Sequence, residues 1–351
     1  MNNLTDKFWP YIKVLAIPYL FILFILLYPI DYMVTAPGGI VEVDSLITVE
    51  YNEDKVVDGS ISSTYVMSIK RPTFFQFMLS QFSDYNNVNA LPTSYASYTN
   101  EELSEMSFLD KYESVNAAII VAYQKANLIH PEIVINYEEK ILVRGKASYL
   151  SFYDDIDFGD EFIKVIGDND LEITDLDEVG SNTTESDAYE FFFKKVDGTI
   201  YSRVLEKDPD EGRFGIEFKN YNIVNEEETF PKYQENSSNI GGPSGGLLQT
   251  LAIYNMLVEE DITKGLKIAG TGEINLNGSV GYIGGVEQKI LTAYLNKVDV
   301  FFIPYLDSER YTDNYLEALR ACEKHGIDPE PWLVPVATFQ DALDYLEGLD
   351  G

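Results

Sequence analysis

The chain has 351 residues, of which 45% are apolar, 58 are acidic and 25 are basic, so its formal net charge is −33 at pH 7. This length exceeds what one hydrophobic core usually organises, so we expect two or three folded units, and the apolar content is too high for the acidity to indicate disorder. Nucleic acid is excluded as a partner, because a polyanion is bound by stripes of Lys and Arg that release its counterions. The single cysteine, Cys322, and the two histidines, His130 and His325, exclude an internal disulfide and a Cys/His zinc cluster. Any hydrolytic chemistry is therefore expected to use a base other than histidine.

Near the N-terminus, 17 uncharged residues separate Lys13 from Asp31. As a helix this segment would be about 25 Å long, against about 30 Å for the hydrocarbon core of a bilayer, so flanking residues must complete a crossing. Aromatic residues on both sides suit the two membrane interfaces. We therefore predict a transmembrane helix over residues 14–33, preceded by a short N-terminal segment, residues 1–13.

The charges beside this span set its orientation. Lys7 and Lys13 precede it and acidic residues follow it, so we expect a single-pass protein of the cell membrane with a cytoplasmic N-terminus and the bulk of the chain extracellular. A cleaved secretory signal is the competing interpretation, since residues 34–36 (VTA) have the small-residue spacing of a cleavage site. Pro37 would follow the scissile bond, and the apolar run is longer than in a typical signal peptide, so a retained anchor is favoured.

Two stretches of alternating apolar and polar residues follow the span, GIVEVDSLITVEY and SISSTYVMSIK, and they predict strands. Residues 100–128 predict a long helix, because Thr99 or Asn100 can cap it and its first turn is acidic. The alanine-rich second half of this helix indicates packing on another unit. We expect residues 34–130 to form an α/β region that packs on the last part of the chain.

Residues 131–221 predict a small β-rich module. EIVINY, ILVRG, TIYSRVLEK and RFGIEFKNY predict strands, and SDAYEFFFKKV predicts a helix among them. Its many carboxylates form runs without the spacing of a calcium-binding loop, so no metal site is expected and a solvated face is the simplest interpretation. The polar residues 222–238 predict a linker to the final region, residues 239–351.

The final region opens with IGGPSGG, residues 240–246, in which four glycines and a proline surround one serine. Apolar residues then recur at helical spacing, so a helix is predicted to begin just after Ser244. The serine hydroxyl would lie at a helix N-terminus beside flexible backbone N–H groups, which stabilise negative charge that develops on an oxygen. Taken alone, the segment fits an ordinary helix cap better than a nucleophile, because capping serines are far more common.

A second glycine-rich segment, GTGEINLNGSVGYIGG, ends just before a predicted helix, VEQKILTAYLNK. Lys289 lies at the edge of the apolar face of that helix, where a lysine is usually a surface residue whose ammonium reaches solvent. Together with a glycine-flanked serine it is also a candidate base. Neither segment has the GxxxxGK[ST] order of an ATP-binding loop or the GxGxxG of a dinucleotide site, so we expect no ATP and no other cofactor.

The combination of GGPSGG, TGEINLNGSVGYIGG and QK on the following helix resembles the proteolytic domain of Lon-type (S16) serine peptidases. Lys289 follows Ser244 by 45 positions, as in that family. The resemblance covers about the last third of the chain, residues 239–351. The branch that is most similar lacks ATP-binding domains and has a membrane anchor and an inserted PDZ domain, as in the SepM-type pheromone-processing and related Lon-like peptidases of Gram-positive bacteria. It implies an α+β chain with a transmembrane helix, a β-rich region, a PDZ-like module and a C-terminal proteolytic domain.

The resemblance also assigns roles to residues. It implies that Ser244 is the nucleophile, that Lys289 is its general base and that Thr271 holds the lysine amine, while backbone N–H groups from Gly242 to Gly245 bind the oxyanion. A base at neutral pH needs a pKa of about 7 to 8, so Lys289 would have to be buried among apolar neighbours. The chain departs from the family at Gly245, where alanine is common, and both residues are small enough for the turn.

We therefore expect an ATP-independent, membrane-anchored serine endopeptidase that cleaves exported peptides or extracytoplasmic protein segments, among them secreted signalling peptides. The acidic exterior favours cationic peptides as substrates. If the PDZ-like module binds a peptide, addition of a strand to an exposed sheet edge is the expected mode. The alternatives are an inactive anchored scaffold with the same fold, which differs only in the competence of Ser244 and Lys289, and an acidic surface adhesin, which has no need of a glycine-flanked serine.

Overall fold

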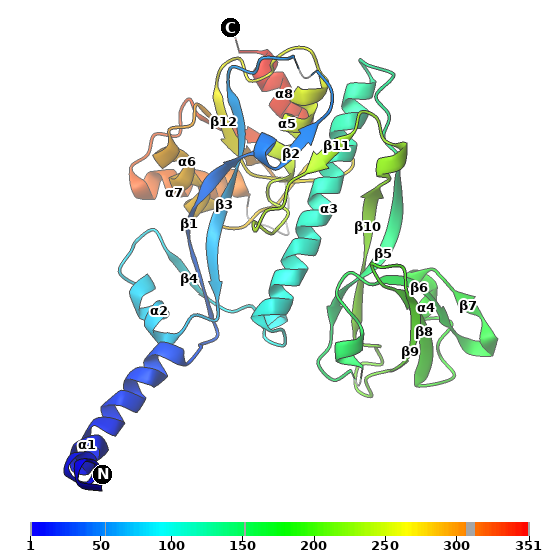
Figure 1. Ribbon diagram of the computed structural model, residues 1–351. Helices are drawn as coiled ribbons and strands as arrows, with labels where there is room; N and C mark the ends of the chain where they lie inside the picture. Colours follow the sequence, from blue (N-terminus) through cyan, green and yellow to red (C-terminus); the bar gives the residue numbers. More distant parts are fainter. Residues whose placement is uncertain (1, 53, 151, 307–312, 350–351) are drawn as a thin grey trace.

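The computed structural model describes residues 2–52, 54–150, 152–306 and 313–349. It contains two six-stranded sheets, and the long helix α3 (Asn100–Asn127) runs between them (Figure 1). At the N-terminal end, α1 (Asn2–Leu27) projects away from both sheets. The mixture of helices and strands expected from the sequence is confirmed.

The first sheet has the strand order β16-β15-β12-β3-β1-β4. β1 and β3 pair antiparallel over most of their length, whereas β12 pairs parallel with both β3 and β15. Strands from residues 34–130 and from the final region thus lie in one continuous sheet. The pairing of β12 with β3 joins the two regions. The strands are β1 (Tyr32–Glu42), β3 (Ser60–Lys70), β4 (Asn87–Ala90), β12 (Lys267–Gly270), β15 (Val300–Pro304) and β16 (Leu333–Val336).

Helices cover both faces of this sheet. α3, α5 and α8 contribute to the core on one face, and α6 and α7 contribute to a separate core on the other. The alternation of side chains along β15 serves both cores, because Phe302 belongs to the first and Phe301 and Ile303 to the second. The covering helices are α5 (Gly246–Leu257), α6 (Val286–Asn296), α7 (Asn314–His325) and α8 (Phe339–Glu347).

The second sheet, which we call the β module, has the order β10-β5-β6-β8-β9, with β7 paired to β6, and has a core of its own. The prediction of a helix for SDAYEFFFKKV is wrong, because this segment forms strand β8. Tyr189, Phe191 and Phe193 are buried at every second position, and this period of two matches a strand lined by aromatic residues. The elements are β5 (Tyr137–Lys146), β6 (Glu161–Ile166), β7 (Glu172–Ile173), α4 (Leu176–Val179), β8 (Ala188–Lys194), β9 (Ile200–Glu206) and β10 (Ile216–Val224).

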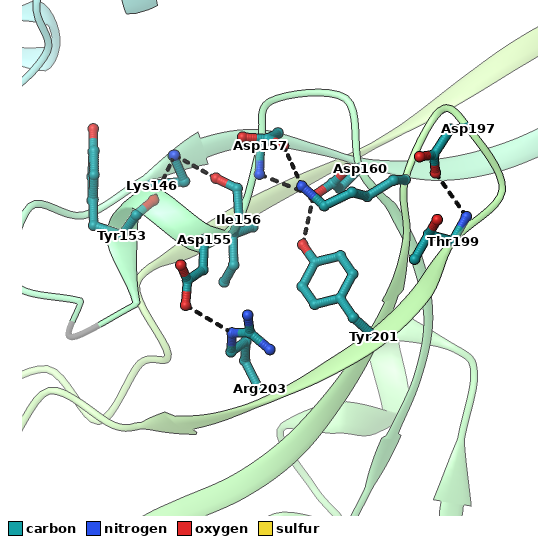
Figure 2. Close-up of polar contacts among 11 residues, drawn as sticks. Lys146, Tyr153, Asp155, Ile156, Asp157, Asp160, Asp197, Thr199, Tyr201 and Arg203 are labelled. Atoms are coloured by element: carbon teal, nitrogen blue, oxygen red, sulfur yellow. Dashed lines mark hydrogen bonds and ion pairs between the residues drawn. The ribbon is translucent and has the colours of Figure 1, made fainter.

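Polar contacts fix the loops at one end of the β module (Figure 2). Lys146 is buried, and its Nζ donates to the carbonyl oxygens of Tyr153 at 2.8 Å and Ile156 at 2.5 Å. The hydroxyl of Tyr201 donates to the carboxylate of Asp160 at 2.5 Å. These bonds satisfy groups that would otherwise be costly to bury, so the loops are held in one arrangement.

The β module is attached to α3 through side chains. The guanidinium of Arg144 on β5 makes two hydrogen bonds to the carboxylate of Asp110 on α3, at 3.0 and 2.9 Å. Farther along α3, Asn116 accepts a hydrogen bond from the backbone N–H of Val224 at 2.8 Å. The long helix predicted here is confirmed, and Thr99 caps it by accepting from the N–H of Glu102.

Five smaller elements, two pairs of short strands and one helix, are also present in the described residues. β2 (Ile47–Val49) pairs with β11 (Tyr233–Glu235), which lies within the segment expected to be a linker, residues 222–238. A short hairpin joins β13 (Glu273–Ile274) to β14 (Val280–Gly281), and α2 (Phe74–Ser80) lies beside the end of α1.

A membrane-spanning helix was expected over residues 14–33. Among the helices in the described part of the chain, none is both long enough and apolar enough to cross a membrane.

Candidate active site

Ser244 lies in a tight turn directly before α5. Gly242 adopts φ +87°, a conformation that favours glycine, and its N–H donates to the carbonyl of Ser107 on α3 at 2.8 Å. The N–H of Gly246 closes the turn by donating to the carbonyl of Pro243 at 3.2 Å. The helix predicted to begin just after Ser244 is confirmed, since α5 begins at Gly246.

The backbone of Ser244 is fixed from the neighbouring segment that follows β12. Its carbonyl oxygen accepts from the N–H of Gly272 at 2.8 Å and from the hydroxyl of Thr271 at 3.0 Å. The N–H of Leu247, in the first turn of α5, donates back to the carbonyl of Gly272 at 3.0 Å. The serine is therefore held between α5 and this segment, with little freedom to move along either.

Lys289 projects from α6 into the interior, where its side chain is only 2% exposed. Burial lowers the pKa of its ammonium to about 7, while the nearby carboxylate of Glu273 opposes this shift. A substantial fraction of the side chain is therefore the neutral amine at neutral pH, which is the form that can accept a proton. The surface position usual for a lysine at this point of a helix is excluded.

Thr271 joins the lysine to the serine backbone. Its hydroxyl has one hydrogen, which it donates to the Ser244 carbonyl, so it accepts a hydrogen bond from Lys289 Nζ at 2.8 Å. When the neutral amine of Lys289 donates a hydrogen to Thr271, its lone pair points in a different direction and is free to accept a proton. Thr271 therefore sets the orientation of the amine as well as its position.

Ser244 and Lys289 both line two neighbouring cavities. One, of about 390 Å³, also contacts Ser63 on β3 and Gln249 on α5. The other, of about 410 Å³, extends toward Asp110 and Arg144 on the side of the β module, together with the start of β1. An extended chain that occupies both cavities would pass the serine hydroxyl.

The amide groups around the serine have different roles. The N–H of Gly242 is engaged by Ser107, so this glycine shapes the turn. Within the described residues, the N–H groups of Ser244 and Gly245 donate to no protein acceptor. These two amides, at the N-terminus of α5, are the donors best placed for an oxyanion.

Several residues that shape the site were not anticipated from the sequence. Two serines of α3 hold the turn. The carbonyl of Ser107 accepts from the N–H of Gly242, and the hydroxyl of Ser114 donates to the carbonyl of Pro243 at 2.8 Å. Nothing in their local sequence marks them, because they lie more than 100 positions from the turn. Glu273 lies in the GTGE segment and could have been found there, and burial raises the pKa of its carboxyl to about 7. Across the part of the chain that the structure describes, no group of His, Cys, Asp and Glu is arranged to hold a metal ion.

Comparison with known proteins identifies the domain in which Ser244, Thr271 and Lys289 lie. A family model described as the Lon protease (S16) C-terminal proteolytic domain matches residues 220–320. The chain is 41% identical over 73 residues to the Lon protease of Ureaplasma parvum serovar 3, 31% over 105 residues to that of Mesomycoplasma hyopneumoniae and 23% over 300 residues to that of Mycoplasma mobile. These matches cover 21%, 30% and 74% of this chain and 9%, 11% and 34% of the three relatives, so the chain spans about a third or less of the length of each. The chain therefore contains a Lon protease (S16) C-terminal proteolytic domain, which is the domain of a serine peptidase.

Proposed function

We propose that this chain is a membrane-anchored serine endopeptidase that works without ATP, with Ser244 as its nucleophile and Lys289 as its general base. The observation that carries the proposal is a buried lysine amine, held by Thr271 at 2.8 Å, in the same cavities that the serine lines. Burying a lysine without a salt bridge is costly, so such an arrangement is typical of a functional site.

The reaction we infer is acyl transfer. The neutral amine of Lys289 accepts the hydroxyl proton of Ser244 while the serine oxygen attacks the carbonyl carbon of a peptide bond. The N–H groups of Ser244 and Gly245 bind the oxygen that becomes negative. The lysine ammonium then gives its proton to the departing amine, and a water molecule, activated by the same lysine, hydrolyses the ester and restores the serine hydroxyl.

The substrate backbone has a natural place beside β3. β12 pairs with β3 only over Ser60–Ser63, and in the described structure no strand continues along that side. Val66 and Ser68, farther along β3, line the larger cavity together with the catalytic pair. An extended segment of a protein or peptide substrate would therefore add to this edge as a strand, with its scissile bond at Ser244.

Charge and the β module bear on which peptides are cut. Residues 151–230 contain 23 acidic and 7 basic side chains, so the field of this region attracts cationic peptides. In the β module, β9 pairs only with β8 and leaves its other edge open. We propose that this PDZ-like module holds an extended part of a cationic exported peptide at that edge while the catalytic pair cuts another part.

The peptidase proposal is tested by Ser244→Ala in the full chain. We expect cleavage of a mixture of internally quenched peptides to fall by more than about 10³-fold, because removal of a catalytic nucleophile leaves only binding and oxyanion stabilisation. A fluorophosphonate probe should label the wild type and not the variant. Cleavage by Ser244→Ala at the wild-type rate would identify a different nucleophile, and a wild-type chain that neither cleaves nor reacts would be an inactive scaffold.

We also propose that α1 anchors the chain in the cell membrane, with the part of the chain after α1 outside. Because no described helix crosses a membrane by itself, residues that flank the apolar stretch of α1 would have to complete the crossing. Its apolar side chains are exposed around the helix, among them Val14 (73%), Ile17 (76%) and Phe21 (63%), and such a surface is stable in lipid and costly in water. We expect the chain to stay in the membrane pellet after an alkaline carbonate wash, and protease added to intact cells to digest the part that follows α1. Release by the wash would contradict the anchor, and protection from protease would contradict the orientation.

A further inference from the structure

The segment after β3 returns to the point where α1 enters the body of the molecule. The backbone N–H of Phe74, the first residue of α2, donates to the carbonyl of Tyr28 at 3.1 Å, and that of Ile30 donates to the carbonyl of Pro72 at 3.0 Å. The rings of Tyr32 and Phe77 pack with their centroids 4.9 Å apart. Backbone bonds therefore fix α2 beside the end of α1 (Figure 1).

Large apolar side chains are exposed on and after α2. Residues 72–83 (PTFFQFMLSQFS) contain no charged side chain, although 24% of the chain is charged. Phe82 is 84% exposed and Leu79 is 51% exposed, which is unusual for such residues on a protein surface in water. We define the α2 surface by its exposed apolar residues, which are Phe74, Phe75, Met78, Leu79 and Phe82.

The neighbouring helix indicates what covers this surface. From Val14 to Leu27 the exposed apolar side chains of α1 occupy all sides of the helix, so a single protein face would leave most of them in water. A lipid phase covers all sides at once. Because the first residue of α2 is hydrogen-bonded to Tyr28, directly after α1, the α2 surface lies where that lipid phase ends.

We propose that the α2 surface inserts into the interface of the same bilayer that holds α1, as an amphipathic segment that lies along the membrane. This inference rests on the proposed anchoring by α1. The contact depends on apolar burial and not on charge, because a chain of net charge −33 is repelled by anionic lipid headgroups. The segment therefore needs no anionic lipid, inserts into a zwitterionic bilayer and keeps its depth at high salt.

The contact restricts which substrates reach the serine. β1 begins at Tyr32, and Met33 and Thr35, its second and fourth residues, line the cavity shared by Ser244 and Lys289. At no more than about 3.3 Å per residue, the six steps from Leu27, the last residue of α1, to Met33 place this end of the cavity within roughly 20 Å of the end of α1. With α2 held in the interface, the cavity lined by Ser244 and Lys289 is fixed close to the bilayer surface. The substrate class that fits is a peptide segment that adsorbs to the membrane or emerges directly from it.

Spin-label depth measurements on the full chain test the inference. In a Cys322→Ala background, single labels are introduced through Leu79→Cys on the α2 surface, Leu20→Cys on α1 and Val196→Cys in the β8–β9 hairpin, where the native side chain is 95% exposed. Each protein is placed in phosphatidylcholine nanodiscs, and the relaxation of the label by oxygen is compared with that by a water-soluble nickel complex. Retained peptide cleavage shows that each variant is folded.

We expect the label at Leu20 to be accessible to oxygen and protected from nickel, the label at Val196 to show the reverse, and the label at Leu79 to fall between them at the depth of the interface, with no change in 0.5 M salt. A lipid-exposed label at Leu20 with a fully aqueous label at Leu79 would overturn the inference and leave the anchor intact. An aqueous label at Leu20 would overturn both. A label at Leu79 that is shielded from both reagents would show a protein contact in place of lipid.

Discussion

Lys289→Met is expected to abolish peptide cleavage while making the folded protein more stable. Loss of a general base costs roughly 10²- to 10⁴-fold in rate. Methionine has a similar length and no charge, so it fills the same buried space without the cost of burying an ammonium. Peptide cleavage and the Tm at several pH values, measured on wild type and variant, check the two effects together.

The pH dependence of both quantities follows from the lowered pKa of Lys289. The folded chain loses this proton near pH 7 and the unfolded chain near the ordinary value of 10.5. Activity should therefore rise as the pH increases through about 7. Between pH 7 and 10.5 the unfolded chain binds the extra proton, so the stability of the wild type rises with pH, and the gain in Tm from Lys289→Met is largest below pH 7 and shrinks above it.

Thr271 supplies the matched comparison for Lys289. Thr271→Ser keeps the hydroxyl that accepts from the amine, whereas Thr271→Val keeps the shape and removes it. We expect Thr271→Ser to stay close to wild type in kcat and Thr271→Val to lose activity with its pH profile displaced. A Thr271→Val enzyme with the wild-type pH profile, or a Lys289→Met enzyme with wild-type activity, would contradict the assigned roles.

Gly246→Ala is expected to destabilise the protein and impair the nucleophile, while Gly245→Ala is tolerated. A Cβ on Gly246 would lie 2.6 Å from the hydroxyl oxygen of Ser114 and 3.0 Å from the backbone nitrogen of Ile274, so α5 would have to shift. Overpacking of this kind costs about 1 to 3 kcal/mol. The same shift would disturb the bond from Ser114 that holds the turn before Ser244.

Gly245 is a matched control because it is the adjacent glycine at the same helix N-terminus. Its φ of −92° suits any residue, and the nearest atom to an added Cβ is the hydroxyl oxygen of Ser63 at 3.2 Å, which can rotate away. Tm by circular dichroism and kcat/KM on one peptide would compare the two variants. Equal stability and activity of both would contradict the packing argument, and loss of activity in Gly245→Ala would show that the turn tolerates no side chain.

Part of the site could be predicted because it depends on local sequence. The turn at Ser244 requires a glycine at the positive φ of Gly242, and a helix follows it directly. The sequence shows both features, as a glycine-rich stretch followed by apolar residues at helical spacing. Lys289 was found in the same way, from its place after a second glycine-rich bend. Its burial was implied only by the chemistry expected of a base, and the structure provides it.

Other features of the fold and the site could not be predicted from local sequence patterns. Three consecutive phenylalanines, Phe191 to Phe193, carry the same apolar content in a helix or a strand, and the pairing of β8 with both β6 and β9 decides for the strand. The two unpaired amides of Ser244 and Gly245 could not be told from that of Gly242, because Ser107 selects among them from a distant helix.

The sequence by itself determined which groups are candidates for the chemistry: a glycine-flanked serine at the start of one helix, a lysine on the next helix, and the short segment with Thr271 between them. Only the tertiary structure decided what holds these groups together. Ser114 reaches the carbonyl of Pro243 across 129 positions of sequence, and β12 from the second half of the chain pairs with β3 from the first half within one sheet. Such contacts join residues far apart along the chain, where no period or motif records which partner each will meet, and they form only because packing and backbone pairing must be satisfied everywhere at once.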